Sequence, residues 1–198
     1  MIAAAREHVI TPEMFFELGF FPNVEVAARR FEKLTEQELL RFCGFVTVSP
    51  EKPKQKAYTA GWIAKANQVE HEFWLTIALF LLRPNAIQRR KVNEKLKPDA
   101  HVWFNKSDGP TELLIELDRG TEKKPQFQRR LKKLAKHPTI WICHADKPAK
   151  AERRMHWMRE INRELAAPHL FTTTYKLMQV PRELWTSWQQ LEVSNDVS

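Results

Sequence analysis

The run 113–118, Leu-Leu-Ile-Glu-Leu-Asp, constrains the fold of this chain more than any other segment. Successive side chains of a β-strand point to opposite faces, so Glu116 and Asp118 share one face of the expected strand, and Ile115 and Leu117 point to the other. A third acid, Asp99, directly precedes a second expected strand at 100–104. These carboxylates either pair with nearby arginine and lysine side chains or supply oxygen ligands to a divalent cation such as Mg²⁺.

Composition favours a protein that binds a polyanion. The chain has 198 residues, a net charge of +8 and a pI of about 9.6, and nucleic acid is the usual partner of such a basic protein. No apolar run is long enough to cross a bilayer, so no membrane partner is expected. Cys43 and Cys143 have no metal-binding or redox spacing, which is typical of reduced thiols in a cytoplasmic protein.

The N-terminal part, 1–66, is predicted to be a winged-helix DNA-binding module. Helices are expected over 12–18 and from Asn23 onwards, and they are followed by strands at 42–48 and 57–59. A winged helix places its second helix in the major groove and its hairpin against the backbone. The candidate DNA-binding residues are Asn23, Arg29, Arg30 and Lys33 on the helix and Lys52, Lys54 and Lys56 on the wing. The alternative is a solvated lysine-rich hairpin tip.

A connecting helix is expected over 67–83, and a further short helix from Gly61 leads into it. The segment 69–82 is apolar on most sides, which is typical of a buried helix or of a subunit contact. We therefore expect a homodimer that uses this helix.

The part 84–180 is predicted to be an α/β (α+β) domain with a mixed sheet covered by helices. The expected elements are helices over 86–96, 126–136 and 149–165 and strands over 100–104, 112–118, 139–144 and 170–178. The segment from Arg119 to Glu164 contains fourteen lysine and arginine residues but only five acidic residues. Four of these bases, on the helix after the acidic strand, are further candidates for DNA contacts: Arg129, Arg130, Lys132 and Lys133. The segment 181–198 is expected to be a tail.

The segments 96–100 (Leu-Lys-Pro-Asp-Ala) and 114–122 (Leu-Ile-Glu-Leu-Asp-Arg-Gly-Thr-Glu) resemble the replication-relaxation family of plasmids and other mobile elements. The resemblance covers roughly residues 20–145, and the run 116–122 is its most specific part. It implies a winged helix followed by a domain similar to the restriction-endonuclease, or PD-(D/E)XK, fold.

Within that comparison, Asp99 and Glu116 match the two acids of the nuclease motif. The lysine expected two positions after the second acid is absent, and Asp118 stands there. That lysine normally stabilises charge on the phosphate. Arg119 points to the opposite face of the strand, so a base from the following helix is the candidate substitute.

The resulting hypothesis is a protein of a plasmid or other mobile genetic element that binds double-stranded DNA and acts in replication, relaxation or transfer. One alternative is a Mg²⁺-dependent DNA endonuclease or nickase whose metal ligands and catalytic residues are Asp99, Glu116 and Asp118. Another is a dimeric winged-helix transcriptional repressor. No cofactor other than Mg²⁺ is expected.

Overall fold

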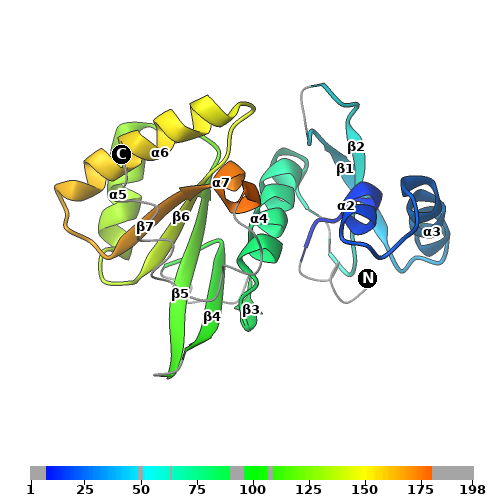
Figure 1. Cartoon of the computed structure of the whole chain (residues 1–198), viewed down its shortest axis with the longest axis horizontal. Coiled ribbons are helices and arrows are strands. Elements are labelled where there is room, and N and C mark those ends of the chain that lie inside the picture. The colour runs from blue at the N-terminus through cyan, green and yellow to red at the C-terminus, as the bar shows by residue number, and fades with distance from the viewer. Residues whose placement is uncertain (1–7, 49–50, 63, 90–95, 107–108, 180–198) are drawn as a thin grey trace. The chain divides into compact units, whose positions relative to one another are not determined.

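The computed structural model describes residues 8–48, 51–62, 64–89, 96–106 and 109–179. The chain divides into two compact units, residues 1–76 and 77–198, and the boundary falls inside one helix (Figure 1).

In the described part of the first unit, two helices are followed by a two-stranded hairpin. Helix α2 spans Pro12–Glu17, helix α3 spans Val24–Glu36, and strands β1 (Arg41–Val46) and β2 (Gln55–Thr59) pair antiparallel. These elements confirm the expected helices and hairpin. The sequence did not indicate the isolated bridge between Ile10 and Tyr58, which adds a third extended segment beside β2.

Local capping explains where the two helices begin. The Thr11 hydroxyl accepts a hydrogen bond from the Met14 amide at 3.2 Å, and the Asn23 side-chain oxygen accepts one from the Val26 amide at 2.8 Å. Such caps satisfy backbone donors that have no partner inside the helix. Gly19, with a φ of 80°, lets the chain turn away after α2.

Three aromatic side chains hold the first unit together. The Phe31 ring of α3 meets Phe15 of α2 at 5.7 Å and Tyr58 of β2 at 5.3 Å, both edge-to-face. All three are at most 4% exposed. The buried, edge-to-face contacts of these three rings hold the two helices against the hairpin.

The segment after the hairpin is not helical from Gly61, which has a φ of 76° and lies in a bend. A short 3-10 helix, η1 (Ala66–Gln68), instead leads into helix α4 (Val69–Leu82). The expected helix at Gly61 is therefore wrong, whereas the connecting helix is confirmed. Across the described parts of the chain, no helix has the length and apolar character that crossing a bilayer requires.

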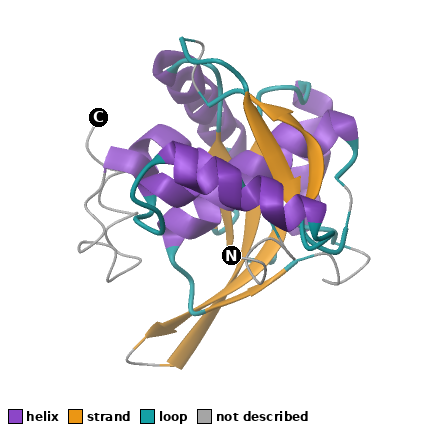
Figure 2. Cartoon of the chain, turned by 90° about the vertical axis from the view of Figure 1, so that its right-hand side faces the viewer, coloured by secondary structure: helices purple, strands orange, loops and turns teal. Residues whose placement is uncertain are grey.

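The second unit contains a five-stranded mixed sheet. Its strands are β3 (Ala86–Gln88), β4 (Ala100–Lys106), β5 (Gly109–Asp118), β6 (Thr139–Cys143) and β7 (His169–Thr173), and they neighbour one another in chain order. The first three pair antiparallel, and the last three are parallel. The far ends of β4 and β5 pair only with each other and project beyond the other strands (Figure 2).

Helices α5 (Lys124–Leu134) and α6 (Pro148–Arg163) form the crossovers between the parallel strands. Both pack on the same face of the sheet, because successive right-handed crossovers that advance in one direction place their helices on one side. Phe127 and Leu131 of α5 and Met158 of α6 meet Leu114 and Trp141 of the sheet in a buried core. The expected α/β class and mixed sheet are confirmed at this level.

Two expected elements in this unit are wrong. Residues 86–88 form an edge strand rather than the start of a helix, because their backbone pairs with 101–103 of β4. The remainder of that expected helix, 90–95, lies outside the described residues, as does the tail 181–198. The expected strand 170–178 ends at Thr173, and helix α7 (Thr174–Gln179) follows it.

Candidate functional site

The acidic strand β5 faces helices α5 and α6 with its polar side chains. Leu114 belongs to the core under these helices, so Glu116 and Asp118, two and four residues further on, point to the same face. Each is only 5% exposed, although the strand end carries both charges. A buried carboxylate needs a partner, and this face supplies two arginine residues.

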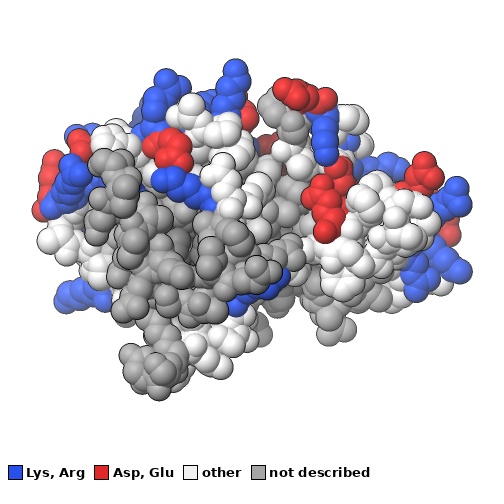
Figure 3. Space-filling view, viewed as in Figure 1, with Lys and Arg blue, Asp and Glu red and all other residues white. Residues whose placement is uncertain are grey.

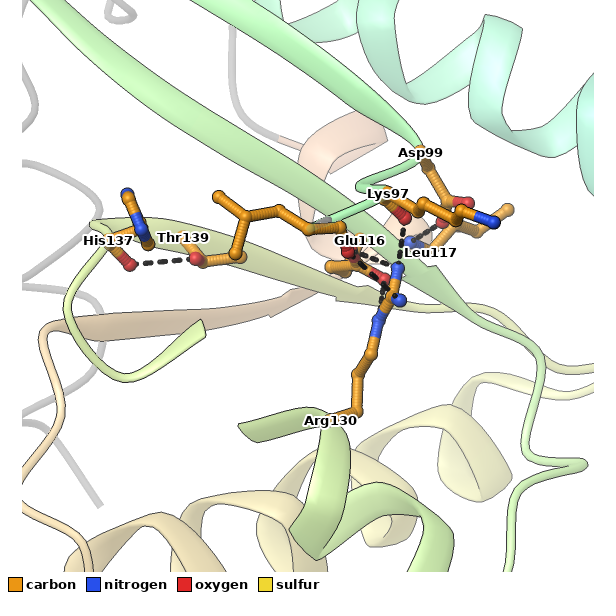
Figure 4. A network of polar contacts seen from close by, with 8 residues as sticks. Lys97, Asp99, Glu116, Leu117, Arg130, His137 and Thr139 are labelled. Carbon is orange, nitrogen blue, oxygen red and sulfur yellow. Dashed lines mark hydrogen bonds and ion pairs between the residues drawn. The ribbon is translucent and has the colours of Figure 1, made fainter. Parts of the chain in front are cut away.

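Glu116 pairs with Arg130 of α5 through both carboxylate oxygens. Arg130 Nη2 lies 2.6 Å from Oε1, and Nε lies 3.2 Å from Oε2. The same guanidinium donates to the carbonyl oxygens of Lys97, at 2.5 Å, and Leu96, at 3.4 Å. Figure 4 shows Arg130 reaching from α5 to Glu116 and to the segment before β4. Of the four helix bases predicted to reach back, the structure identifies Arg130.

Asp99 is the second acid near the Glu116–Arg130 pair. Its Oδ2 accepts a hydrogen bond from the Leu117 amide at 2.8 Å, and its own amide donates to the Ile115 carbonyl at 3.1 Å. The carboxyl of Asp99 therefore sits next to β5, beside Glu116 (Figure 4). Burial first, and then the negative charge of Asp99, raise the pKa of Glu116 well above its ordinary value, against the opposing effect of Arg130.

Asp118 has a separate partner, Arg154 of α6. Arg154 Nε lies 2.5 Å from Oδ2, and Nη2 lies 3.3 Å from Oδ1. Oδ1 also accepts the Gly120 amide at 3.0 Å, and Arg154 donates to the Glu122 carbonyl at 2.9 Å. The guanidinium stacks 4.0 Å from the Trp157 ring centre. Both oxygens of Asp118 are thus engaged, and the strand end is tied to α6.

Sequence reasoning missed Arg154. The segment 148–163 carries several basic residues, and only the common packing of α5 and α6 on one face singles out one of them. A buried aspartate opposite a helix was the available signal, because such a group requires a cation. Glu122 lies near the same group, and burial followed by Asp118 raises the pKa of its carboxyl.

Asp99 lies beside Glu116, and Asp118 is two residues further along the same face of β5, where Glu116 and Asp118 each pair with an arginine. Mg²⁺ needs oxygen ligands in near-octahedral geometry and usually retains several waters. Here two guanidinium groups already engage Glu116 and Asp118 in bidentate pairs. Within the described ranges, no cluster of three or more histidine, cysteine or acidic side chains is arranged to hold a metal ion. The carboxylate oxygens of Glu116 and Asp118 are therefore engaged by arginine in this structure.

The predicted DNA-binding residues of the first unit divide into two groups. Arg29, Arg30 and Lys33 are exposed on α3, whereas the side chain of Asn23 caps that helix. The wing lysines are exposed too, and two of them pair with acids: Lys52 with Glu13 at 2.8 Å and Lys56 with Glu32 at 3.5 Å. Lys54 is exposed as well. In Figure 3, basic and acidic side chains alternate on the surface over α3, at the right of the view.

Helix α5 carries a more uniform charge. Arg129, Lys132 and Lys133 are exposed, and the helix contains no acidic residue. Arg130, between them in sequence, turns inward to Glu116. Three of the four predicted bases on this helix therefore remain at the surface, and the fourth belongs to the carboxylate cluster.

Comparisons with known proteins give no assignment, since no family model, curated protein or solved structure matches the chain. The function of the chain is therefore inferred from its own residues and their geometry.

Proposed function

We propose that this protein binds double-stranded DNA, and that its second unit is a nuclease-like domain that does not cut it. The observation that carries the proposal is the exposed basic set Arg29, Arg30 and Lys33 on α3, within two helices and a hairpin in winged-helix order. The bridge between Ile10 and Tyr58 joins the segment before α2 to the hairpin.

A role for the protein in replication, relaxation or transfer of a plasmid or other mobile element is part of the same proposal. It rests on the resemblance of the run 116–122. The second unit adds phosphate contacts through the exposed bases of α5, Arg129, Lys132 and Lys133. It adds no hydrolysis, because Arg130 and Arg154 occupy the carboxylates that would hold the metal.

The structure weakens the argument for a homodimer that rested on the apolar helix α4. Most apolar side chains of α4, including Phe73, Trp74 and Leu79, are buried in the chain itself. Their burial accounts for a helix that is apolar on most sides without a second copy. Sedimentation equilibrium of the full chain would measure the stoichiometry directly.

Fluorescence anisotropy with a labelled duplex tests the proposal. Replacing Arg29, Arg30 and Lys33 together by alanine removes three phosphate contacts, so the slope of log affinity against log salt falls by about 3. The matched control removes the same charge from exposed positions of α6: Lys150, Arg153 and Arg163. Equal weakening of DNA binding by both triple variants would mean that net charge alone drives binding. The proposal that α3 forms the DNA-binding surface would then be rejected.

The competing function is a metal-dependent endonuclease, which is favoured by the adjacency of Asp99 and Glu116. It requires Arg130 to leave Glu116 when a metal arrives. Mg²⁺- or Mn²⁺-dependent nicking that disappears in Glu116→Gln would establish the endonuclease activity and rule out a nuclease-like domain that does not cut DNA.

A further inference from the structure

A groove on the first unit lies between α3 and the β1–β2 hairpin. It is open to solvent and has a volume of about 540 Å³. Glu32, Thr35 and Glu36 of α3 form one wall, and Phe42, Phe45 and Tyr58 of the hairpin form much of the rest. The basic set of α3 that carries the proposed DNA contact is not part of its lining.

The apolar part of this groove is built by a β-bulge. Residues three apart on a regular strand point to opposite faces, yet Phe42 and Phe45 pack edge-to-face with ring centres 5.2 Å apart. The register of β1 shifts between Phe42 and Gly44, so that Phe42 pairs with Tyr58 and Gly44 with Ala57. The extra residue brings both rings to one side, as bulges commonly do when they redirect a side chain.

Both rings are unusually accessible for their size. Phe42 is 48% exposed and Phe45 is 55% exposed. Exposed aromatic pairs that line a concave surface mark interaction sites more often than scattered apolar residues do. The Phe42 ring also meets Tyr58, at 6.1 Å, so the aromatic surface continues into the groove.

The charge of the groove is negative. Glu32 and Glu36 lie one turn apart on α3, and the single lysine in the lining, Lys56, is 3.5 Å from Glu32. Among the residues that the structure describes, Glu36 has no ion-pair partner. Burial and the charge of Glu32 raise the pKa of the Tyr58 hydroxyl, in keeping with a negative potential here. A phosphate backbone is therefore repelled from this groove.

The acids and the bases of α3 centre on different sides of the helix, and Arg29 borders the acidic side. At about 100° per residue, Glu25, Glu32 and Glu36 fall within about 40° of one another, and the three bases follow beside them. The groove lies on the acidic side, since Glu32 and Glu36 line it. One helix thus has a side suited to phosphates and a side suited to cations.

We infer that the groove binds a short peptide segment of a partner protein that carries an arginine or lysine next to an aromatic or aliphatic residue. The cationic side chain pairs with Glu36, and the apolar side chain packs on Phe42 and Phe45. An arginine over either ring adds a cation–π contact. This inference does not depend on DNA binding, because the two sides of α3 are used separately.

An NMR titration of the isotope-labelled full chain tests the inference with three probes: acetyl-Arg-Trp-Arg-Leu-amide, its counterpart acetyl-Glu-Trp-Glu-Leu-amide, and oligothymidylate. We expect saturable shifts of amides in 32–36 and 42–45 with the basic peptide and none with the acidic one. Absence of such shifts at millimolar basic peptide would overturn the inference. Equal shifts with the acidic peptide would do so too, and the same shifts with oligothymidylate would replace it with a base-stacking surface.

Exposed positions allow variants that leave the core intact. We expect Glu36→Gln to weaken the basic peptide about threefold and Phe45→Ala about fivefold or more. Glu25→Gln and Phe20→Ala are the matched controls, because Glu25 lies on α3 outside the groove and Phe20 is 64% exposed elsewhere. Equal effects of controls and groove variants would contradict the site. Shifts of these amides that depend on protein concentration alone would assign the groove to a second copy instead.

Discussion

The two units use the same chemical pair, a carboxylate and a basic side chain, in opposite surroundings. In the first unit the Lys52 and Glu13 side chains are 54% and 21% exposed. In the second unit the values are 23% and 7% for Arg130 and Glu116, and 17% and 4% for Arg154 and Asp118. The first kind of pair can exchange its partner with solvent or phosphate, whereas the second belongs to the fold.

The difference follows from the cost of removing a charge from water. An exposed pair gains little, because water and salt screen it, so losing one member changes stability little. A buried pair has already lost its hydration, and removal of one member leaves the other charge uncompensated. Under the proposed function we therefore expect phosphate contacts from exposed bases, because carboxylates already engage Arg130 and Arg154.

The largest effect is expected from a variant that breaks a buried ion pair. Arg130→Ala leaves Glu116 without its cation, and we expect the second unit to lose about 3–5 kcal/mol of unfolding free energy above neutral pH. Hydrogen exchange of the β5 and β6 amides would measure it. As a control, the double variant Arg130→Met, Glu116→Leu should recover most of the loss. A loss below about 1 kcal/mol in the single variant would place this pair in the exposed class.

The pH dependence sharpens the comparison. Burial and Asp99 raise the pKa of Glu116 above its ordinary value of 4.5, so the folded chain holds this proton more tightly than the unfolded chain. The stability that protonated Glu116 contributes is fully present below the pKa of this residue in the unfolded chain. It is lost as the pH rises through the pKa of Glu116 in the folded chain. The unfolding free energy of the wild type should therefore fall, relative to Glu116→Gln, as the pH rises above 4.5. A difference that rises with pH would mean that Arg130 outweighs burial.

A smaller effect is expected at Asn23, a predicted DNA contact whose side-chain oxygen also caps α3. Asn23→Ala removes the hydrogen bond to the Val26 amide and should cost the first unit about 1 kcal/mol, measured by thermal unfolding. Asn23→Asp keeps the cap and should retain stability. Should Asn23→Ala leave the melting temperature unchanged while it weakens duplex binding, Asn23 would be a DNA contact and not a cap.

The smallest effect is expected at the exposed pairs. Lys52→Ala and Lys56→Ala should leave the melting temperature within experimental error, because both lysines are solvated. Lys52→Ala should still weaken duplex binding slightly and lower its salt dependence. A clear fall in melting temperature for either variant would remove the contrast between the units.

Local signals in the sequence were enough for much of the fold. Thr11 and Asn23 mark the starts of α2 and α3 through their own caps, and the apolar spacing of Phe127 and Leu131 predicts α5. The strand β3 was missed because three exposed residues at 86–88 gain their conformation from pairing with β4. No local pattern reports such a partner.

The candidate site was predictable in part for the same reason. Alternation along β5 placed Glu116 and Asp118 on one face, and the structure agrees. The identity of their partners depends on which arginine of α5 and α6 turns inward, and that is set by packing between elements far apart in sequence. Arg154 lies 36 residues from Asp118.

Incubation of the full chain with supercoiled plasmid, in Mg²⁺, in Mn²⁺ and in chelator, tests the central claim most directly. Glu116→Gln serves as the matched variant. If Arg130 and Arg154 have taken the place of the metal, the plasmid is retarded but intact in every lane, for both proteins. Metal-dependent nicking by the wild type that is lost in Glu116→Gln would contradict this account and identify an active nuclease.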